Sequence, residues 1–305
     1  MKLIAAFFKL IRWPNLVFII LTQVLFFFCV YQPIFHAHGE RMLGWLLVAS
    51  VCIAAAGYII NDYFDLNIDQ INKPGKNVFA RVLHRRWAII WHIGLSVAGI
   101  IATAIAVSFG KWYLIIANII CVALLWLYST SFKRQLLIGN FVISLLTAWT
   151  VLILFFAKVP FNSVYGNDDP DITKYFRISY LYAGFAFVIS LVREALKDVE
   201  DLKGDLRYGC RTLPIVTGIR TTKVYVAVWL SVLIGSLILL QLYILQFKWY
   251  IAVLYSVLFV IGPSILLFKR LVKARSTQDF SRLSALTKFI MFTGILSMIF
   301  FRLYF

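Results

Sequence analysis

Nine long apolar runs constrain this chain more than any other feature of its sequence. About 20 apolar residues cross the hydrocarbon core of a bilayer as a helix. That measure predicts spans at Asn15–Phe35, Leu43–Tyr63, Ala88–Phe109, Trp112–Tyr128, Leu137–Ala157, Tyr175–Leu196, Val224–Ile244, Trp249–Phe268 and Ala285–Tyr304. Hydrophobic residues make up 62% of the chain, against roughly 45–50% in an average soluble domain. The sequence predicts an all-α polytopic membrane protein in which residues 1–305 form a single integral-membrane domain.

Lys and Arg are divided unequally between the two sets of loops. With the N-terminus inside, the inner segments carry 22 of them and the outer segments seven, and Lys288 falls within the last span. Because cytoplasmic loops are rich in Lys and Arg, this split predicts the N-terminus inside and the C-terminus outside. The same distribution accounts for the formal charge of +17 without a nucleic-acid partner. The N-terminal sequence shows no transit-peptide pattern, so we expect the plasma (inner) membrane of a prokaryote.

Acidic residues are concentrated in two short windows, NDYFDLNID and DVEDLKGD, at the inner ends of the second and sixth spans. Each window carries three aspartates at positions i, i+3 and i+7. On a helix this spacing places three carboxylates on one stripe. Like charges repel, and a carboxylate loses hydration near hydrocarbon, so we expect a cation to bind each stripe. The aspartates are Asp62, Asp65, Asp69, Asp198, Asp201 and Asp205.

This arrangement suits a diphosphate that is held by Mg²⁺. The ion prefers one or two carboxylates together with waters and substrate phosphates, so one ion on each stripe would clamp a diphosphate between the windows. Basic side chains would neutralise the remaining charge. We therefore expect all six aspartates to be metal ligands, and an amphiphilic substrate with its hydrocarbon chain in the bundle. The predicted substrate-binding residues near the windows are Asn61, Lys73, Lys76, Arg81, Lys197 and Lys203.

A third group lies at the inner end of the fourth span, in LYSTSFKRQ. Tyr128 ends the span, and Lys133 and Arg134 follow it towards the same compartment. We expect all three to belong to the site. Taken singly, Tyr128 would be an interfacial aromatic residue with topogenic charges behind it, and one acidic window would be a solvated helix end. Because two acidic windows share the same spacing and face the same side, we favour a functional site over these alternative interpretations.

These motifs resemble those of the UbiA superfamily of intramembrane prenyltransferases. NDYFDLNID is similar to its first signature and DVEDLKGD to its second, and Arg12 and Asn15 in IRWPN resemble its first-helix motif. The resemblance covers essentially the whole chain and implies the family's nine-helix fold. It also implies Mg²⁺-dependent transfer of a prenyl group from a polyprenyl diphosphate to an acceptor. The catalytic residues would be the six aspartates, Tyr128 and Lys133, with Asn15 binding substrate. Tyr63 and Trp126 are alternatives to Tyr128 for stabilising an allylic cation.

These motifs leave two alternatives for the prenyl acceptor. REALKDVEDLKGD and the Gly139–Asn140 pair are most similar to the geranylgeranylglyceryl-phosphate prenyltransferase branch. A quinone precursor of the hydroxybenzoate or dihydroxynaphthoate type is the alternative. Alcohol phosphatidyltransferases are rejected, because their motif requires Gly after the second Asp and Leu66 follows Asp65 here. A divalent-cation or lipid transporter would need ionisable groups along the spans, and the candidates are Lys288, His92 and Arg177.

Overall fold

The computed structural model describes residues 7–72, 85–107, 109–160 and 169–304. Within these ranges nine helical spans are long and apolar enough to cross a membrane, and no strand is found. The predicted all-α polytopic architecture is thus confirmed. The spans are Trp13–Phe35 (α2, η1 and α3), Glu40–Phe64 (α4), Arg86–Ala106 (within α6, Arg85–Ala106), Tyr113–Thr130 (α7), Ile138–Lys158 (α8), Pro170–Glu200 (α9), Leu213–Leu245 (α11), Tyr250–Lys273 (α12, η5 and α13) and Thr277–Tyr304 (α14 and α15).

Several spans extend beyond the apolar runs that predicted them. The seventh begins at Leu213 instead of Val224, with a kink at Gly218 (φ 85°, ψ 160°) between its first turns and the rest of the span, and the ninth begins at Thr277 instead of Ala285. In the ninth span the Ser276 side chain accepts from the Asp279 amide, and the Asp279 carboxylate accepts in return from the Ser276 amide. This capping box starts the helix in a polar segment. A count of apolar residues misses polar helical turns of this kind, because they belong to the helix but lie outside the hydrocarbon.

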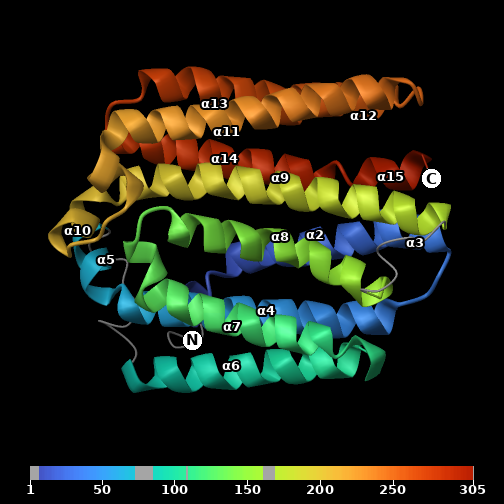
Figure 1. Cartoon of the computed structure of the whole chain (residues 1–305), viewed down its shortest axis with the longest axis horizontal. Helices are drawn as coiled ribbons and strands as arrows, with labels where there is room; N and C mark the ends of the chain where they lie inside the picture. Colours follow the sequence, from blue (N-terminus) through green and yellow to red (C-terminus); the bar gives the residue numbers. More distant parts are fainter. Residues whose placement is uncertain (1–6, 73–84, 108, 161–168, 305) are drawn as a thin grey trace.

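Two long helices organise the bundle. The sixth span, α9, packs against α8, α11 and α14, and the second span, α4, packs against α6, α7 and α2. The first helix, α2 (Trp13–Phe26), joins the two groups because it contacts α4, α8 and α14. Figure 1 shows these helices running side by side along one direction. A cavity between the two groups therefore has α2, α4, α8, α9 and α14 as potential walls.

Both acidic windows lie at the same end of the bundle. Each long helix is followed there by a short one, α5 (Leu66–Asn72) after α4 and α10 (Leu202–Arg207) after α9, and Figure 1 shows α5 and α10 together while the C-terminus lies at the opposite end. We call this end the Asp end. Arg12, just before α2, also lies here because it pairs with Asp62. The compartment that the Asp end faces stays a prediction from the Lys and Arg count.

The expected single helical stripe of three carboxylates is wrong, because each helix breaks at its middle aspartate. Asp65 (φ −85°, ψ −2°) separates α4 from α5, and Asp201 (φ −91°, ψ 6°) separates α9 from α10. A ψ near zero takes each residue out of the regular α-helix, and Asp has a low helix propensity. We call these two breaks the first and second elbows. The elbows turn the chain so that α5 packs on α10.

A glycine permits this close approach. The backbone amide of Gly204 in α10 donates to Asn72 Oδ1 in α5 at 2.7 Å. A Cβ atom at position 204 would lie 2.5 Å from Asn72 Nδ2, which is closer than real Cβ contacts. A side chain at position 204 would therefore displace the Asn72 amide that accepts from the Gly204 backbone. The hydrogen bond between Gly204 and Asn72 links the first elbow to the second.

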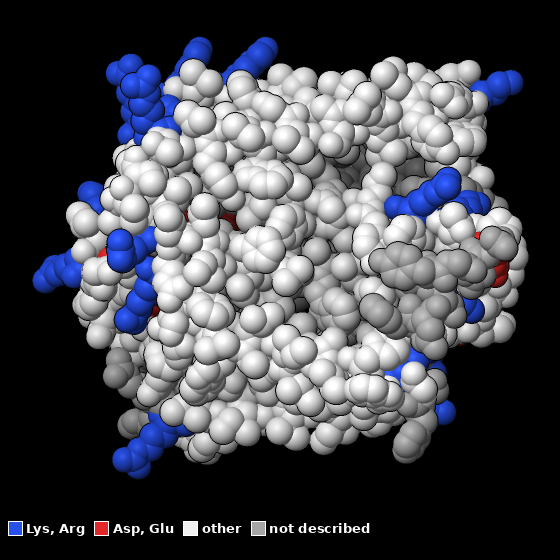
Figure 2. All heavy atoms as spheres, viewed as in Figure 1, with Lys and Arg blue, Asp and Glu red and all other residues white. Residues whose placement is uncertain are grey.

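The surface matches a membrane-spanning bundle. In Figure 2 the Lys and Arg side chains lie towards the two ends of the visible face, and a broad band without them separates the ends. Large apolar side chains such as Leu239, Ile251 and Leu254 are exposed on the spans. Exposed apolar surface of this extent on apolar helices indicates contact with lipid. The protein is an integral membrane protein.

Candidate active site

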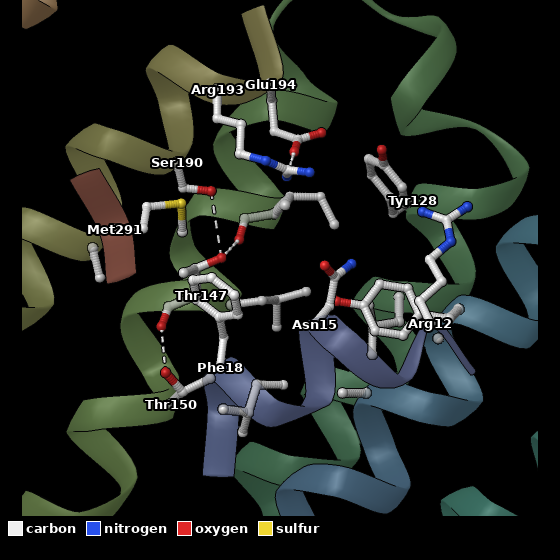
Figure 3. A pocket seen from close by; sticks show the side chains of 18 of the residues that line it. Arg12, Asn15, Phe18, Tyr128, Thr147, Thr150, Ser190, Arg193, Glu194 and Met291 are labelled. Atoms are coloured by element: carbon white, nitrogen blue, oxygen red, sulfur yellow. Dashed lines mark hydrogen bonds and ion pairs between the residues drawn. The ribbon is translucent and has the colours of Figure 1, made fainter. Parts of the chain in front are cut away.

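One cavity of about 500 Å³ begins at the elbows and continues into the bundle. Its volume lies in the range of roughly 300–1,000 Å³ that small-molecule sites occupy. Near the elbows it is lined by Asp65 and Asp198, and deeper in the bundle by Trp149 and Met298. In Figure 3 the charged side chains and Tyr128 gather at one end, while Phe18 and Thr150 lie towards the other. The cavity thus joins a polar end to a largely apolar interior.

Most of the residues predicted for the site lie on the wall of this cavity. They are Asn15, Asn61, Asp65, Tyr128, Lys133, Lys197, Asp198, Asp201 and Asp205. Asp62 does not line the cavity. It pairs with Arg12, and Arg12 does line the cavity. Arg134 and Lys203 are exposed at the Asp end. Lys73, Lys76, Arg81 and the side chain of Asp69 lie outside the described residues.

Of the three aromatic candidates for cation stabilisation, Tyr128 is the one that lines the cavity. Trp126 packs edge-on against Phe64 and beside His92, on the side of α7 towards α4 and α6. Tyr63 packs against Phe64. The position of Tyr128 near the elbows, with its ring in the cavity wall, suits an aromatic group that faces a developing cation.

The first elbow holds its carboxylates with cations. Arg12 Nη2 donates to Asp62 Oδ1 at 2.5 Å, and the Arg12 guanidinium also lies 5.4 Å from the centroid of the Tyr58 ring. Lys133 forms an ion pair with Asp65 Oδ1. The other Asp65 oxygen accepts from Asn61 Nδ2 at 2.8 Å. Both carboxylates that the structure describes at this elbow therefore have a basic partner from the chain itself.

Local packing places Lys133 over the first elbow. The residue lies in the short helix η3 (Phe132–Arg134), which folds back onto the start of α8. A Cβ atom at Gly139 would lie 2.8 Å from Lys133 Cα, so glycine is needed for this contact. The Lys133 side chain is 14% exposed. Burial lowers the pKa of Lys133 to about 8, and the nearby Asp205 carboxylate opposes that shift, so the ammonium is still charged at neutral pH.

The second elbow has a different set of partners. Asp198 accepts from Asn140 Nδ2 at 2.8 Å, which is a neutral donor. The nearby cations instead hold Glu194, one helical turn before Asp198. Glu194 Oε1 accepts from Arg193 Nη1 at 2.7 Å, and Glu194 Oε2 accepts from Lys197 Nζ at 3.1 Å. No ion pair of Asp198 is found within the part of the chain that the structure describes.

Sequence reasoning missed several residues of the cavity wall. They are Tyr58, Asn72, Asn140, Arg193, Glu194 and Lys288. Arg193 was assigned to topology, and Lys288 was considered for transport. The three ionisable groups that a transporter would need do not form a path, because His92 is buried with Nδ1 at 3.0 Å from the Ala56 carbonyl and Arg177 is exposed. A basic or acidic residue inside an apolar run was the available signal for Arg193, Glu194 and Lys288.

The donor set of the cavity fits Mg²⁺. Among the side chains that the structure describes, no three His, Cys, Asp or Glu residues converge into a complete protein cage. Mg²⁺ seldom needs one, because it takes one or two carboxylates with waters and substrate phosphates. The carboxylates that line the cavity supply oxygen atoms, which are the ligands that Mg²⁺ takes. The Asn61 side-chain oxygen is also buried without a hydrogen-bond partner in the described structure, so it is a spare ligand oxygen beside Asp65.

A helical membrane bundle with acidic groups at one end of a largely apolar cavity suits an enzyme that acts on an amphiphile with a phosphorylated head group. Residues 18–294 match the profile of the UbiA prenyltransferase family. This match covers most of the chain, and the protein belongs to that family. The predicted family and the predicted prenyltransferase class are thereby confirmed.

Two curated relatives carry the same description, digeranylgeranylglyceryl phosphate synthase. The protein from Methanosphaera stadtmanae is 27% identical over 83% of this chain and 86% of its own length. The protein from Thermococcus sibiricus is 34% identical over 60% of this chain and 59% of its own length.

Solved structures share the fold. A structure described as that of digeranylgeranylglyceryl phosphate synthase in membranes has a TM-score of 0.62 at 22% identity, covering 98% of this chain and 99% of the other. A UbiA homolog from Archaeoglobus fulgidus, bound to GPP and Mg²⁺, has a TM-score of 0.58 at 14% identity, covering 96% of this chain and 99% of the other. The predicted nine-helix UbiA fold is confirmed.

Proposed function

We propose that this protein transfers a prenyl group from a polyprenyl diphosphate to a hydroxyl group of a glyceryl phosphate lipid. The observation that carries the proposal is the single cavity, which places carboxylates from both elbows beside basic side chains and continues into an apolar interior. The two curated relatives named as digeranylgeranylglyceryl phosphate synthases support this acceptor. The inner face of a prokaryotic plasma membrane is the proposed location. The whole chain is proposed to act as one domain.

Mg²⁺ is the proposed cofactor. Asp65, with the spare oxygen of Asn61, would hold an ion at the first elbow, and Asp198 with Asp201 and Asp205 would hold one at the second. Asp62 and Asp69 are retained as proposed ligands of the first elbow. When bound, the ions would draw charge from the leaving diphosphate. The A. fulgidus homolog whose structure holds Mg²⁺ together with GPP supports a divalent metal.

The basic side chains at the elbows would bind and orient the diphosphate. Lys133 is paired with Asp65 and would move its charge to the diphosphate when a metal ion replaces it on the carboxylate. Lys197 lies on the same wall as Asp198 and would neutralise a second phosphate oxygen. Asn15, at the start of α2, would donate from the opposite wall. Arg134, Lys203, Lys73, Lys76 and Arg81 are proposed to attract the diphosphate from the membrane surface.

Tyr128 would act at the reacting carbon. As the C1–O bond of the prenyl diphosphate breaks, the electron pair leaves with the diphosphate and positive charge develops on the allylic group. The face of the Tyr128 ring stabilises such a charge by a contact of about 2 kcal/mol when water is excluded. The apolar walls around Phe18, Ile143 and Met298 would hold the chain and keep water away. The acceptor hydroxyl oxygen would then bond to C1 and its proton would pass to the released diphosphate, so that the products are the ether lipid and protonated diphosphate.

The experiment that tests the proposal offers one donor to several acceptors. Purified protein in lipid nanodiscs is incubated with Mg²⁺, labelled geranylgeranyl diphosphate and either geranylgeranylglyceryl phosphate, hydroxybenzoate or dihydroxynaphthoate, and products are identified by mass spectrometry. We expect a diether lipid product from the first acceptor. Prenylation of the aromatic acids alone would overturn the proposed acceptor, and a lack of product from every acceptor would overturn the proposed reaction with this donor.

A further inference from the structure

We propose that Arg193 and Lys288 form a second anion subsite, which binds the phosphate monoester of the acceptor lipid separately from the diphosphate at the elbows. This inference rests on the proposed function, because it assigns residues to the acceptor named there. Both residues line the cavity. Arg193 belongs to α9 and Lys288 to α14, so the subsite lies between two helices that pack directly on each other.

The register of α9 and α14 places Arg193 and Lys288 at the same depth in the bundle. The helices α9 and α14 run antiparallel, since α9 ends and α14 begins at the Asp end. Gly294 of α14 lies against the ring of Phe185 of α9, since a Cβ atom at Gly294 would lie 2.5 Å from that ring. Lys288 is six residues, or about 9 Å, nearer the Asp end than Gly294, which places it beside the turn of α9 that holds Ser190 and Arg193. Figure 3 shows the Arg193 side chain directed into the cavity.

Cations outnumber carboxylates in the immediate surroundings of Lys288. Lys288 lies within electrostatic range of Arg193, Lys197, Arg12 and Glu194. Arg12 is neutralised by Asp62. Glu194 is the one carboxylate among these groups, and it is shared by Arg193 and Lys197. If Lys197 neutralises a carboxylate of the second elbow, two positive charges, on Arg193 and Lys288, are still compensated by one negative charge, on Glu194. A surplus cation within a membrane span is costly and marks a functional site, and an anionic ligand would compensate it.

Arg193 also has an unused donor. Its Nη1 group donates to Glu194, whereas its Nε group is buried and has no hydrogen-bond partner in the described structure. The guanidinium group presents its donors in a planar fork that suits phosphate oxygens. The Ser190 hydroxyl, three residues before Arg193 on α9, lies 3.4 Å from the Thr147 hydroxyl on α8, which itself donates to the Ile143 carbonyl. The subsite thus combines a partly satisfied guanidinium group, an ammonium group and a nearby hydroxyl group.

Its position separates it from the diphosphate. Arg193 precedes Asp198 by five residues on α9, which corresponds to about 7.5 Å along the helix axis. The acceptor phosphate would bind at Arg193 and Lys288 while the donor diphosphate binds at the elbows. A hydroxyl group a few bonds from the acceptor phosphate could then reach the C1 carbon below the diphosphate. The subsite would select acceptors that carry a phosphate over neutral alcohols.

The test compares acceptors with and without the phosphate. We would measure transfer from geranylgeranyl diphosphate to geranylgeranylglyceryl phosphate and to the corresponding glycerol ether without phosphate, for the wild type, Lys288→Met, Lys288→Arg and the control Lys273→Met. Lys273 is an exposed cation at the Asp end of the bundle and does not line the cavity. Loss of one charge-assisted contact should raise KM for the phosphorylated acceptor about tenfold to a hundredfold in Lys288→Met. Lys288→Arg should recover most of this loss.

Three results would be informative. A KM increase for the phosphorylated acceptor, a reduced preference for it over the neutral ether and an unchanged KM for the donor would support the subsite. An equal rise in KM for the donor would show that Lys288 binds the diphosphate and would overturn the inference. An unaltered acceptor preference in Lys288→Met would also overturn it. In both cases wild-type transfer to the lipid would leave the proposed function standing, whereas inactive wild-type protein would overturn the proposed function itself.

Discussion

The two elbows have the same backbone and opposite electrostatics. Each ends a long helix at the middle aspartate of a triplet, with ψ near zero, and continues into a short helix. At the first elbow Lys133 neutralises Asp65 and Arg12 neutralises Asp62. At the second, Asp198 has a neutral amide partner, Asn140. The difference indicates that the chain itself supplies cations to the carboxylates described at the first elbow, whereas Asp198 at the second elbow has a neutral partner and suits an added cation.

The largest effect should come from the second elbow. Replacement of Asp198 by Asn keeps the shape but removes the charge that no described basic side chain pairs with. We expect the rate of prenyl transfer to fall by at least about a hundredfold to a thousandfold, measured with labelled donor and mass spectrometry. Glu200→Gln is the matched control, because Glu200 ends the same helix and does not line the cavity. Near-normal turnover in Asp198→Asn would contradict the assigned role.

At the first elbow, removing the resident cation should have two opposite effects. In Lys133→Met, Asp65 loses its ion pair, so the metal concentration needed for half-maximal binding should decrease. The donor loses a basic contact, so kcat/KM for the diphosphate should fall about tenfold to a hundredfold. Calorimetric metal titration and steady-state kinetics measure the two effects separately. Weaker metal binding in this variant would mean that Lys133 supports the metal instead of competing with it.

The link between the elbows can be broken by a single methyl group. In Gly204→Ala the new Cβ atom would overlap the Asn72 amide, and overpacking of this kind costs about 1–3 kcal/mol. We expect a lower melting temperature in detergent together with reduced activity. Gly235→Ala is the control, since a Cβ atom there has no neighbour within 4 Å and alanine favours the helix. Equal melting temperatures for Gly204→Ala and the wild type would argue against this close contact.

The smallest effect should follow removal of the neutral partner. Asn140→Ala removes one hydrogen bond to Asp198, and such a bond contributes about 0.5–1.5 kcal/mol. Metal binding attributed to the second elbow should change by a factor of about two to ten, while metal binding at the first elbow stays the same. A loss as large as that of Asp198→Asn would show that Asn140 touches the substrate itself. The metal dependence of turnover in the two variants distinguishes these cases.

The sequence predicted what depends on composition and local spacing. Nine apolar runs predicted the nine spans, and two aspartate triplets marked the ends of α4 and α9 where the cavity begins, because these signals are carried by neighbouring residues. The break at Asp65 and at Asp201 was missed, since a spacing of i, i+3 and i+7 is compatible with a continuous helix. The broken geometry accompanies the packing of α5 on α10 at Gly204, a contact between residues far apart in the sequence.

Partners across the bundle could not be read from the sequence. Asn140 and Asp198 are 58 positions apart, and Arg12 and Asp62 are 50 apart. Their pairing depends on how the helices are arranged in three dimensions. Arg193 and Lys288 were also missed as cavity residues, because Arg193 was counted with the basic residues that set the topology and Lys288 was left outside that count. Their common position on one wall appears only when α9 and α14 are in register.

The ion pair between Lys133 and Asp65 would make metal loading an exchange instead of a simple addition. A divalent ion held by Asp65 would displace an ammonium group that stays tethered to the chain and would be available to the diphosphate. Without the ion, the same ammonium group would pair with the carboxylate again. Treatment with a chelator should therefore leave the first elbow folded and ready for reloading, so activity lost by chelation should return when Mg²⁺ is restored.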